Sequence, residues 1–146
     1  MKKVLCITLA AVLTFLLCAC NFTTNLSDSM GMTSAECIPE VEAVLQALTD
    51  DKPDEAKAYF HPDMAENTGD ALAQMSDYLD GRKVSELTQQ GLKVNTSTGT
   101  AGKIRQEAVT MKVVLEDGTV CYLSATHRTD NAGEGFVSFQ LVLGVV

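Results

Sequence analysis

The stretch KIRQEAVTMKVVLEDGTVCYLSATHR, from Lys103 to Arg128, predicts the fold more clearly than any other part of the chain. Apolar and polar residues alternate both before and after the turn sequence EDGT, at 116–119. Two half-buried antiparallel strands joined as a hairpin have this pattern. The apolar row of the first strand consists of Val109, Met111, Val113 and Leu115.

The length of the turn decides which residues of the second strand share that row. Asp117-Gly118 is typical of a two-residue turn, because glycine tolerates a positive φ. With that turn, Leu115 lies opposite Val120 and Val113 lies opposite Tyr122, so we expect all four to be buried. Cys121 then lies on the other face of the sheet, together with Leu123 and Ala125.

Helical patterns precede the hairpin, and strands flank it. The expected helices are one with apolar positions Val41, Val44, Leu45 and Leu48, preceded by a capping box at Thr33–Glu36; one from Asp54 to Phe60, capped by Asp50 or Asp51; and one from Thr68 to Asp80. The expected outer strands are Val84–Thr98, interrupted by Gly91, and Gly135–Val146, with Val137, Phe139, Leu141, Leu143 and Val145 alternating. Helices followed by a strand meander predict an α+β fold, with the helices on one face of an antiparallel sheet.

The N-terminus has the pattern of an export signal. Lys2 and Lys3 precede the uncharged apolar stretch Val4–Leu17, which is too short to span a bilayer comfortably. The following residues, Leu17-Cys18-Ala19-Cys20, resemble the lipobox of bacterial lipoproteins. The resemblance implies a signal peptide at 1–19 and a diacylglycerol on Cys20, which becomes the new N-terminus. The alternatives are an ordinary cleaved signal or a short anchor.

The remainder of the chain divides into a tether and one domain. Residues 20–33 are rich in Asn, Thr, Ser, Gly and Met without a helical or strand period, and residues 34–146 form the α+β domain. We therefore expect a protein held at the cell membrane by its lipid, with the domain on the extracytoplasmic side.

Charge is distributed unevenly along the chain, whose formal net charge is −8. Residues 33–80 carry twelve acidic and two basic side chains, a net of −10, whereas residues 82–146 carry a net of +1. The acidity argues against nucleic acid as a partner, because nucleic-acid binding depends on neutralising phosphates. An acidic helical surface is either simply solvated or a site for a basic partner.

The order of elements resembles the nuclear transport factor 2-like superfamily, also described as ketosteroid isomerase-like or cystatin-like. The resemblance rests on the helical stretches Val41–Leu48, Asp54–Phe60 and Leu72–Leu79, with Gly81 after the last, and on the strands from Lys103 onward. It implies a curved sheet that forms a cone with a pocket, and dimers through the exposed sheet face, where we expect Thr110, Leu123 and Ala125.

Enzymes of that superfamily use an aspartate or histidine base in the cone together with an oxyanion-binding tyrosine or acid. The candidate pocket residues here are Tyr59, His61, Tyr78 and Tyr122. No local motif identifies the catalytic aspartate. The simpler interpretation is a histidine that complements a helix dipole and tyrosines packed at the edge of the core.

Cys37 and Cys121 are the remaining cysteines of the domain, and the sequence leaves open whether they form a disulfide or stay separate thiols. The chain has no H-x-x-x-H, paired C-x-x-C or calcium-loop pattern, so we expect neither a metal nor a cofactor. Three hypotheses for the function follow. The favoured one is a non-enzymatic lipoprotein that binds a small apolar ligand or an envelope protein; the others are an isomerase- or hydrolase-type enzyme and a purely structural envelope component.

Overall fold

The computed structural model describes residues 34–144. The expected signal peptide, the lipid site at Cys20 and the tether lie outside the described residues, as does Val145 of the last expected strand. The helical segments are α2 (Ile38–Thr49), α3 (Pro53–Ala56), the 3-10 turn η2 (Lys57–Tyr59), α4 (Pro62–Ala65) and α5 (Gly69–Leu79). The strands are β1 (Val84–Gly99), β2 (Gly102–Leu115), β3 (Val120–Asp130) and β4 (Gly133–Leu143).

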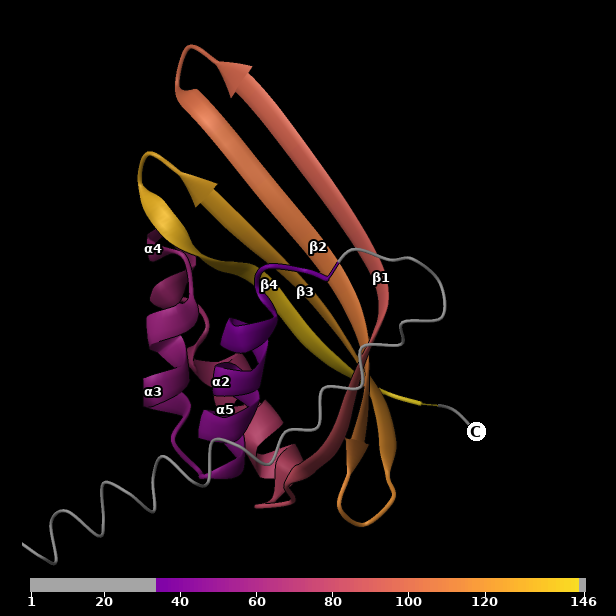
Figure 1. The fold of residues 1–146 in the computed structure, drawn as a ribbon. Helices are drawn as coiled ribbons and strands as arrows, with labels where there is room; N and C mark the ends of the chain where they lie inside the picture. Colours follow the sequence, from indigo (N-terminus) through magenta and orange to yellow (C-terminus); the bar gives the residue numbers. More distant parts are fainter. Residues whose placement is uncertain (1–33, 145–146) are drawn as a thin grey trace, which may run out of the picture.

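The expected α+β class is confirmed. The four strands form one antiparallel sheet in the order β1-β2-β3-β4, and the helices lie against one of its faces (Figure 1). β3 pairs with β2 only from Arg105 to Val114, so the far end of the β1–β2 hairpin extends beyond the other two strands. The sheet is an open one, with β1 and β4 as its edges.

The hydrophobic core lies between α2, α5 and the near face of the sheet. The predicted inward row of β2 is confirmed, and the apolar stripe expected on the first helix packs against it, as do Leu72 and Leu79 of α5. Among the described residues, the buried apolar side chains all lie between Ala35 and Phe139, so this part of the chain has a hydrophobic core of its own. The fully buried members include Val41, Val44, Leu45, Leu72, Leu79, Met111 and Val113.

The predicted register of the β2–β3 hairpin is wrong by one residue. Val113 lies opposite Cys121, and Met111 lies opposite Leu123. The Gly118 N–H donates to the Leu115 carbonyl at 2.9 Å, and the Leu115 N–H donates to the Thr119 carbonyl at 2.9 Å. The loop therefore has three residues, ending in Gly118 at φ 83°. This is the usual three-residue hairpin, in which a glycine in the left-handed region follows a type I turn.

One extra loop residue exchanges the two faces of β3, because side chains alternate along a strand. Cys121, Leu123 and Ala125 are consequently buried under the helices, whereas Tyr122 is 42% exposed on the outer face. The outer surface expected for a dimer is corrected as well, since Leu123 and Ala125 point away from it.

A bulge changes the predicted alternation of β4. The β3–β4 register shifts between Thr126 and His127, so Phe136 and Phe139 are both buried although three positions separate them. Their rings meet edge to face, with centroids 5.2 Å apart, and Phe60 packs against both. These three aromatic rings fill the sheet end beside α4.

The predicted helix starts are also corrected. Thr33 of the expected capping box lies outside the described residues, and the N-cap of α2 is Cys37, which makes no side-chain capping hydrogen bond. Instead the Glu36 and Cys37 amides donate to the carboxylate of Glu107 on β2, at 3.1 and 3.0 Å. Glu107 is almost fully buried, and its negative charge complements the positive end of the α2 dipole. Likewise neither aspartate caps the second helix, whose first residues follow Lys52 at the N-cap without a side-chain hydrogen bond.

The hairpin register is testable by substituting two adjacent residues. We expect Leu123→Ala to lower the free energy of unfolding by about 2–5 kcal/mol, because it leaves a cavity in the core, and Tyr122→Ala to lower it by less than about 1 kcal/mol. Urea unfolding followed by circular dichroism measures both. If Tyr122→Ala were the more destabilising substitution, the result would support the two-residue turn instead.

Candidate functional site

The structure does not bring the four candidate pocket residues together. Tyr59 lies on the outer side of the helical layer, and Tyr78 lies on α5, with its ring 5.2 Å from Cζ of Arg82. Tyr122 is on the opposite face of the sheet, and His61 is fully buried. No shared pocket is formed by these four side chains, so the catalytic arrangement that the family resemblance implied has no counterpart among them.

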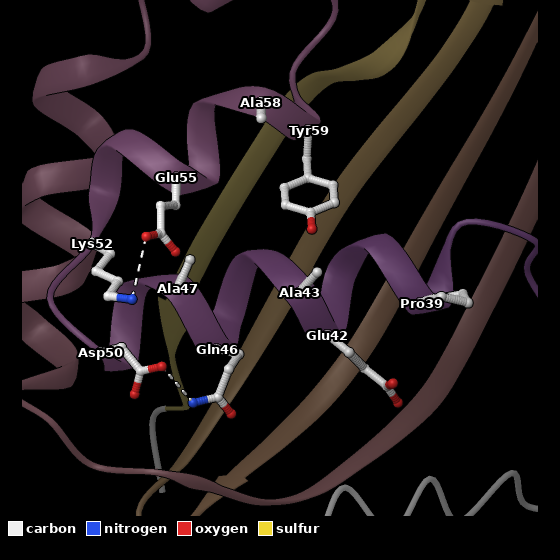
Figure 2. A pocket seen from close by; sticks show the side chains of 10 residues that line it. All are labelled: Pro39, Glu42, Ala43, Gln46, Ala47, Asp50, Lys52, Glu55, Ala58 and Tyr59. Atoms are coloured by element: carbon white, nitrogen blue, oxygen red, sulfur yellow. Dashed lines mark hydrogen bonds and ion pairs between the residues drawn. The ribbon is translucent and has the colours of Figure 1, made fainter. Parts of the chain in front are cut away.

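A groove of about 550 Å³ lies on the surface between α2 and the α3–η2 segment, and is here called the α2–α3 groove (Figure 2). Ala43, Ala47 and Ala58 face the space between the two segments, and the Tyr59 ring reaches from η2 toward α2. The groove is lined by Pro39, Glu42, Ala43, Gln46, Ala47, Asp50, Lys52, Glu55, Ala58 and Tyr59.

The helical period of α2 creates this groove. One stripe of the helix is buried in the core, and positions 43, 46, 47 and 50 form a second stripe, turned toward α3. Alanines on that stripe leave the space between the two segments unfilled, because they have no side-chain atoms beyond Cβ.

The rim of the α2–α3 groove is acidic. Glu42, Asp50 and Glu55 contribute carboxylates, and the Lys52 ammonium is already in an ion pair with Glu55 at 3.2 Å. Asp50 also accepts a hydrogen bond from the Gln46 side chain at 3.0 Å. The groove therefore combines an apolar floor with excess negative charge.

A second groove, of about 370 Å³, lies between α5 and the edge strand β4; we call it the α5–β4 groove. Its α5 side presents positions 71, 74, 75 and 78, whose three- and four-residue spacings place them on one face of the helix, and its β4 side presents positions 139–142. None of the lining residues is charged: they are Ala71, Gln74, Met75, Tyr78, Phe139, Gln140, Leu141 and Val142.

His61 belongs to a buried polar cluster instead of a pocket. Its Nδ1 accepts from the Asp63 amide at 3.2 Å, which makes His61 the N-cap of α4 and not the end of the preceding helix. Since Nδ1 accepts, Nε2 carries the proton and donates to Asp130 Oδ1 at 3.1 Å. Arg128 joins Asp130 at 2.8 Å and also pairs with Asp63.

The cluster fastens α4 to the β3–β4 hairpin. The His61 amide donates to the Phe136 carbonyl at 3.0 Å, and Gly135, at φ 147°, permits this approach. A Cβ at Gly135 would lie 2.4 Å from the His61 nitrogen. Because the imidazole is fully buried and its two nitrogens are engaged, we interpret this histidine–aspartate pair as structural.

The described cysteines are free, buried thiols. The structure does not join Cys37 to Cys121. The Cys37 amide contacts Glu107, which lies opposite His127 on β3. Cys121 is six residues from His127 along the same strand, so His127 and Cys121 are about 20 Å apart. A disulfide requires Cα atoms within about 7 Å. Burial, with a contribution from the Glu107 charge, raises the pKa of Cys37 to about 12, and burial raises the pKa of Cys121, so both remain protonated at neutral pH.

Within residues 34–144 no group of three or more His, Cys, Asp or Glu side chains is arranged to hold a metal ion. No helix in that range is both long and apolar enough to cross a membrane. Comparisons with protein-family models, with curated proteins and with solved structures give no match.

Sequence reasoning missed the partners of the buried charges. A signal for Glu107 was present, because its position continues the inward row of Val109 and Met111, where a carboxylate needs a partner. The alanines of α2 gave a comparable signal for the α2–α3 groove. Nothing local could have linked His61 to Asp130, which lie 69 positions apart.

The Asp130 carboxylate predicts an acid-sensitive component of stability. The pKa of Asp130 is held below its usual value, mainly by the hydrogen bond from the Ala132 amide and next by the hydrogen bond with His61. The contribution of the Asp130 carboxylate to folding stability is therefore present above about pH 4 and is lost as the pH falls toward the folded-state pKa. We expect Asp130→Asn to be destabilised relative to wild type at neutral pH, with the difference shrinking in acid. Thermal unfolding from pH 7 to pH 3 measures this difference.

Asp77→Asn is the matched control, because Asp77 is exposed on α5. It should show little difference from wild type across the same pH range. A difference for Asp130→Asn that is independent of pH would contradict the assignment.

Proposed function

We propose that this protein is a lipid-anchored, non-enzymatic binding module on the extracytoplasmic face of the cell membrane. The lipobox-like sequence Leu17-Cys18-Ala19-Cys20 supports the anchor, with Cys20 as the lipidated residue. In this proposal the tether holds the α+β domain near the membrane surface.

We also propose that the domain is a shallow variant of the ketosteroid isomerase-like cone. The order of elements supports this relation, since helices precede a four-stranded meander and cover one face of it. Phe60, Phe136 and Phe139 pack together at the sheet end beside α4. The two grooves described above are on the surface, which favours a protein partner over a small apolar ligand held inside.

The partner that best fits the α2–α3 groove is a basic segment of an envelope protein. Its acidic rim around an alanine floor is the observation that carries this proposal. A lysine or arginine side chain has an apolar stem and a cationic end, so the stem can lie on the alanines and Tyr59 while the charge meets a carboxylate. The net charge of −10 on residues 33–80 steers such a partner toward this side of the domain.

Lipidation is tested by metabolic labelling of the full chain with a palmitate analogue in a bacterial host. We expect labelling of wild type and of Cys18→Ser, and its loss in Cys20→Ser, because the lipid is attached to the thiol that follows Ala19. Equal labelling of Cys20→Ser and wild type would refute the anchor without bearing on the groove.

Groove binding is tested with a short Lys/Ser peptide that carries one Trp. The chain itself has no Trp, so the fluorescence reports the peptide alone. The protein is the chain from residue 20 with Cys20→Ser. We expect the pair Asp50→Asn and Glu55→Gln to weaken binding roughly 3- to 30-fold, because each exposed charge pair contributes up to about 1 kcal/mol.

The matched control pair is Asp77→Asn and Glu134→Gln, which removes the same charge from exposed positions outside the groove. It should bind the peptide nearly as well as wild type. If both pairs weaken binding equally, attraction is to the overall charge and the groove is not the site. A Glu/Ser peptide should not bind.

A further inference from the structure

β4 is an edge strand whose second half, from Ser138 to Leu143, lacks the usual protection against pairing. Natural edges carry charges, prolines or bulges that discourage the addition of another strand. The β1 edge has Glu86, Lys93 and a register shift at Gln89/Gly91. From Ser138 to Leu143, beyond its bulge, β4 has no charged residue and no proline.

The backbone groups available on β4 follow from the ladder with β3. The Gly144 amide donates to the Val120 carbonyl at 3.3 Å, and backbone groups alternate in direction along an antiparallel strand. The N–H and C=O groups of positions 138, 140 and 142 therefore point to β3. The N–H and C=O groups of Phe139, Leu141 and Leu143 point away from β3, toward the open edge. This stretch of β4 begins after Phe136, whose carbonyl already accepts from the His61 amide.

The helix beside this edge is uncharged on the side that faces it. α5 presents Ala71, Gln74, Met75 and Tyr78 to the α5–β4 groove, whereas Asp70, Asp77 and Asp80 lie at other positions of the same segment. A helix stripe and a strand edge thus form one continuous neutral surface on a chain with a net charge of −8.

Exposed apolar side chains gather on the same strand. Among the described residues, Val142 is 56% exposed and Leu143 is 57% exposed, and Tyr122 lies directly across from Val142 on β3. Solvated single apolar residues are ordinary, but Val142 and Tyr122 are neighbours on the outer face at an open sheet edge, and Leu143 is exposed on the other face of the same edge.

We propose that β4 pairs antiparallel with β4 of a second copy of this chain, around a two-fold axis, so that two four-stranded sheets become one of eight strands. An antiparallel edge is complementary to itself, and a two-fold contact closes at two copies. The charge distribution favours a second copy, because two acidic chains approach with least repulsion where both are neutral. This inference is independent of the lipid anchor and of the α2–α3 groove.

The test combines mass and hydrogen exchange on the chain from residue 20 with Cys20→Ser. Sedimentation velocity across the micromolar range should show a monomer–dimer equilibrium. Amide exchange measured by NMR should slow with increasing concentration at Phe139, Leu141 and Leu143, whose N–H groups become paired in the dimer. The exchange at the β1 edge should not change.

The disrupting variant is Gln140→Glu with Val142→Glu, at two exposed positions of β4. It should raise the dimer dissociation constant by roughly tenfold or more, because like charges across a strand pair destabilise it. Thr96→Glu with Thr98→Glu adds the same charge to the exposed end of β1 and should leave the dimer unchanged.

Three outcomes would overturn the proposal: a monomer at every concentration, a dimer whose three β4 amides exchange at a constant rate, or equal weakening by both variants. The first would leave β4 free for a strand of a different protein. The second would place the dimer contact on another surface. The third would show only general charge repulsion.

Discussion

The three-residue loop at 116–118 sets which face of β3 meets the helices, and much of the molecule follows from it. Gly118 adopts φ 83°, and Leu115 closes the loop through hydrogen bonds with Gly118 and Thr119. This register buries Leu123 beside Met111 and turns Tyr122 outward. The packed core and the apolar neighbours on the outer face are thus two consequences of one loop length.

The second constraint is the burial of charge on the inner face of the sheet. Glu107 lies there because strand alternation puts it in the row of Val109, and the N-terminus of α2 supplies the amides that its carboxylate needs. Arg105 adds an ion pair with Glu36 at 2.8 Å. The same contacts that satisfy Glu107 therefore join the helical layer to β2.

The interior of the domain is packed, so the candidate binding sites are on its surface. The aromatic rings near α4 and the buried His61–Asp130 pair stabilise the sheet end and present no accessible reactive group. The two grooves differ in charge: the α2–α3 groove is acidic, and the α5–β4 groove is neutral. That difference is the physical basis for proposing different partners, a basic segment at one and a second copy of the chain at the other.

The sequence by itself determined the α+β class, the amphipathic stripe of α2 and the inward row of β2, because these depend on periodicity along the chain. It also showed the glycine of the hairpin, but two loop lengths accommodate that glycine. Only the tertiary structure decided between them, and it also decided the cap of α2 and the partner of His61. Each of these depends on contacts between residues far apart in sequence, which no local pattern encodes.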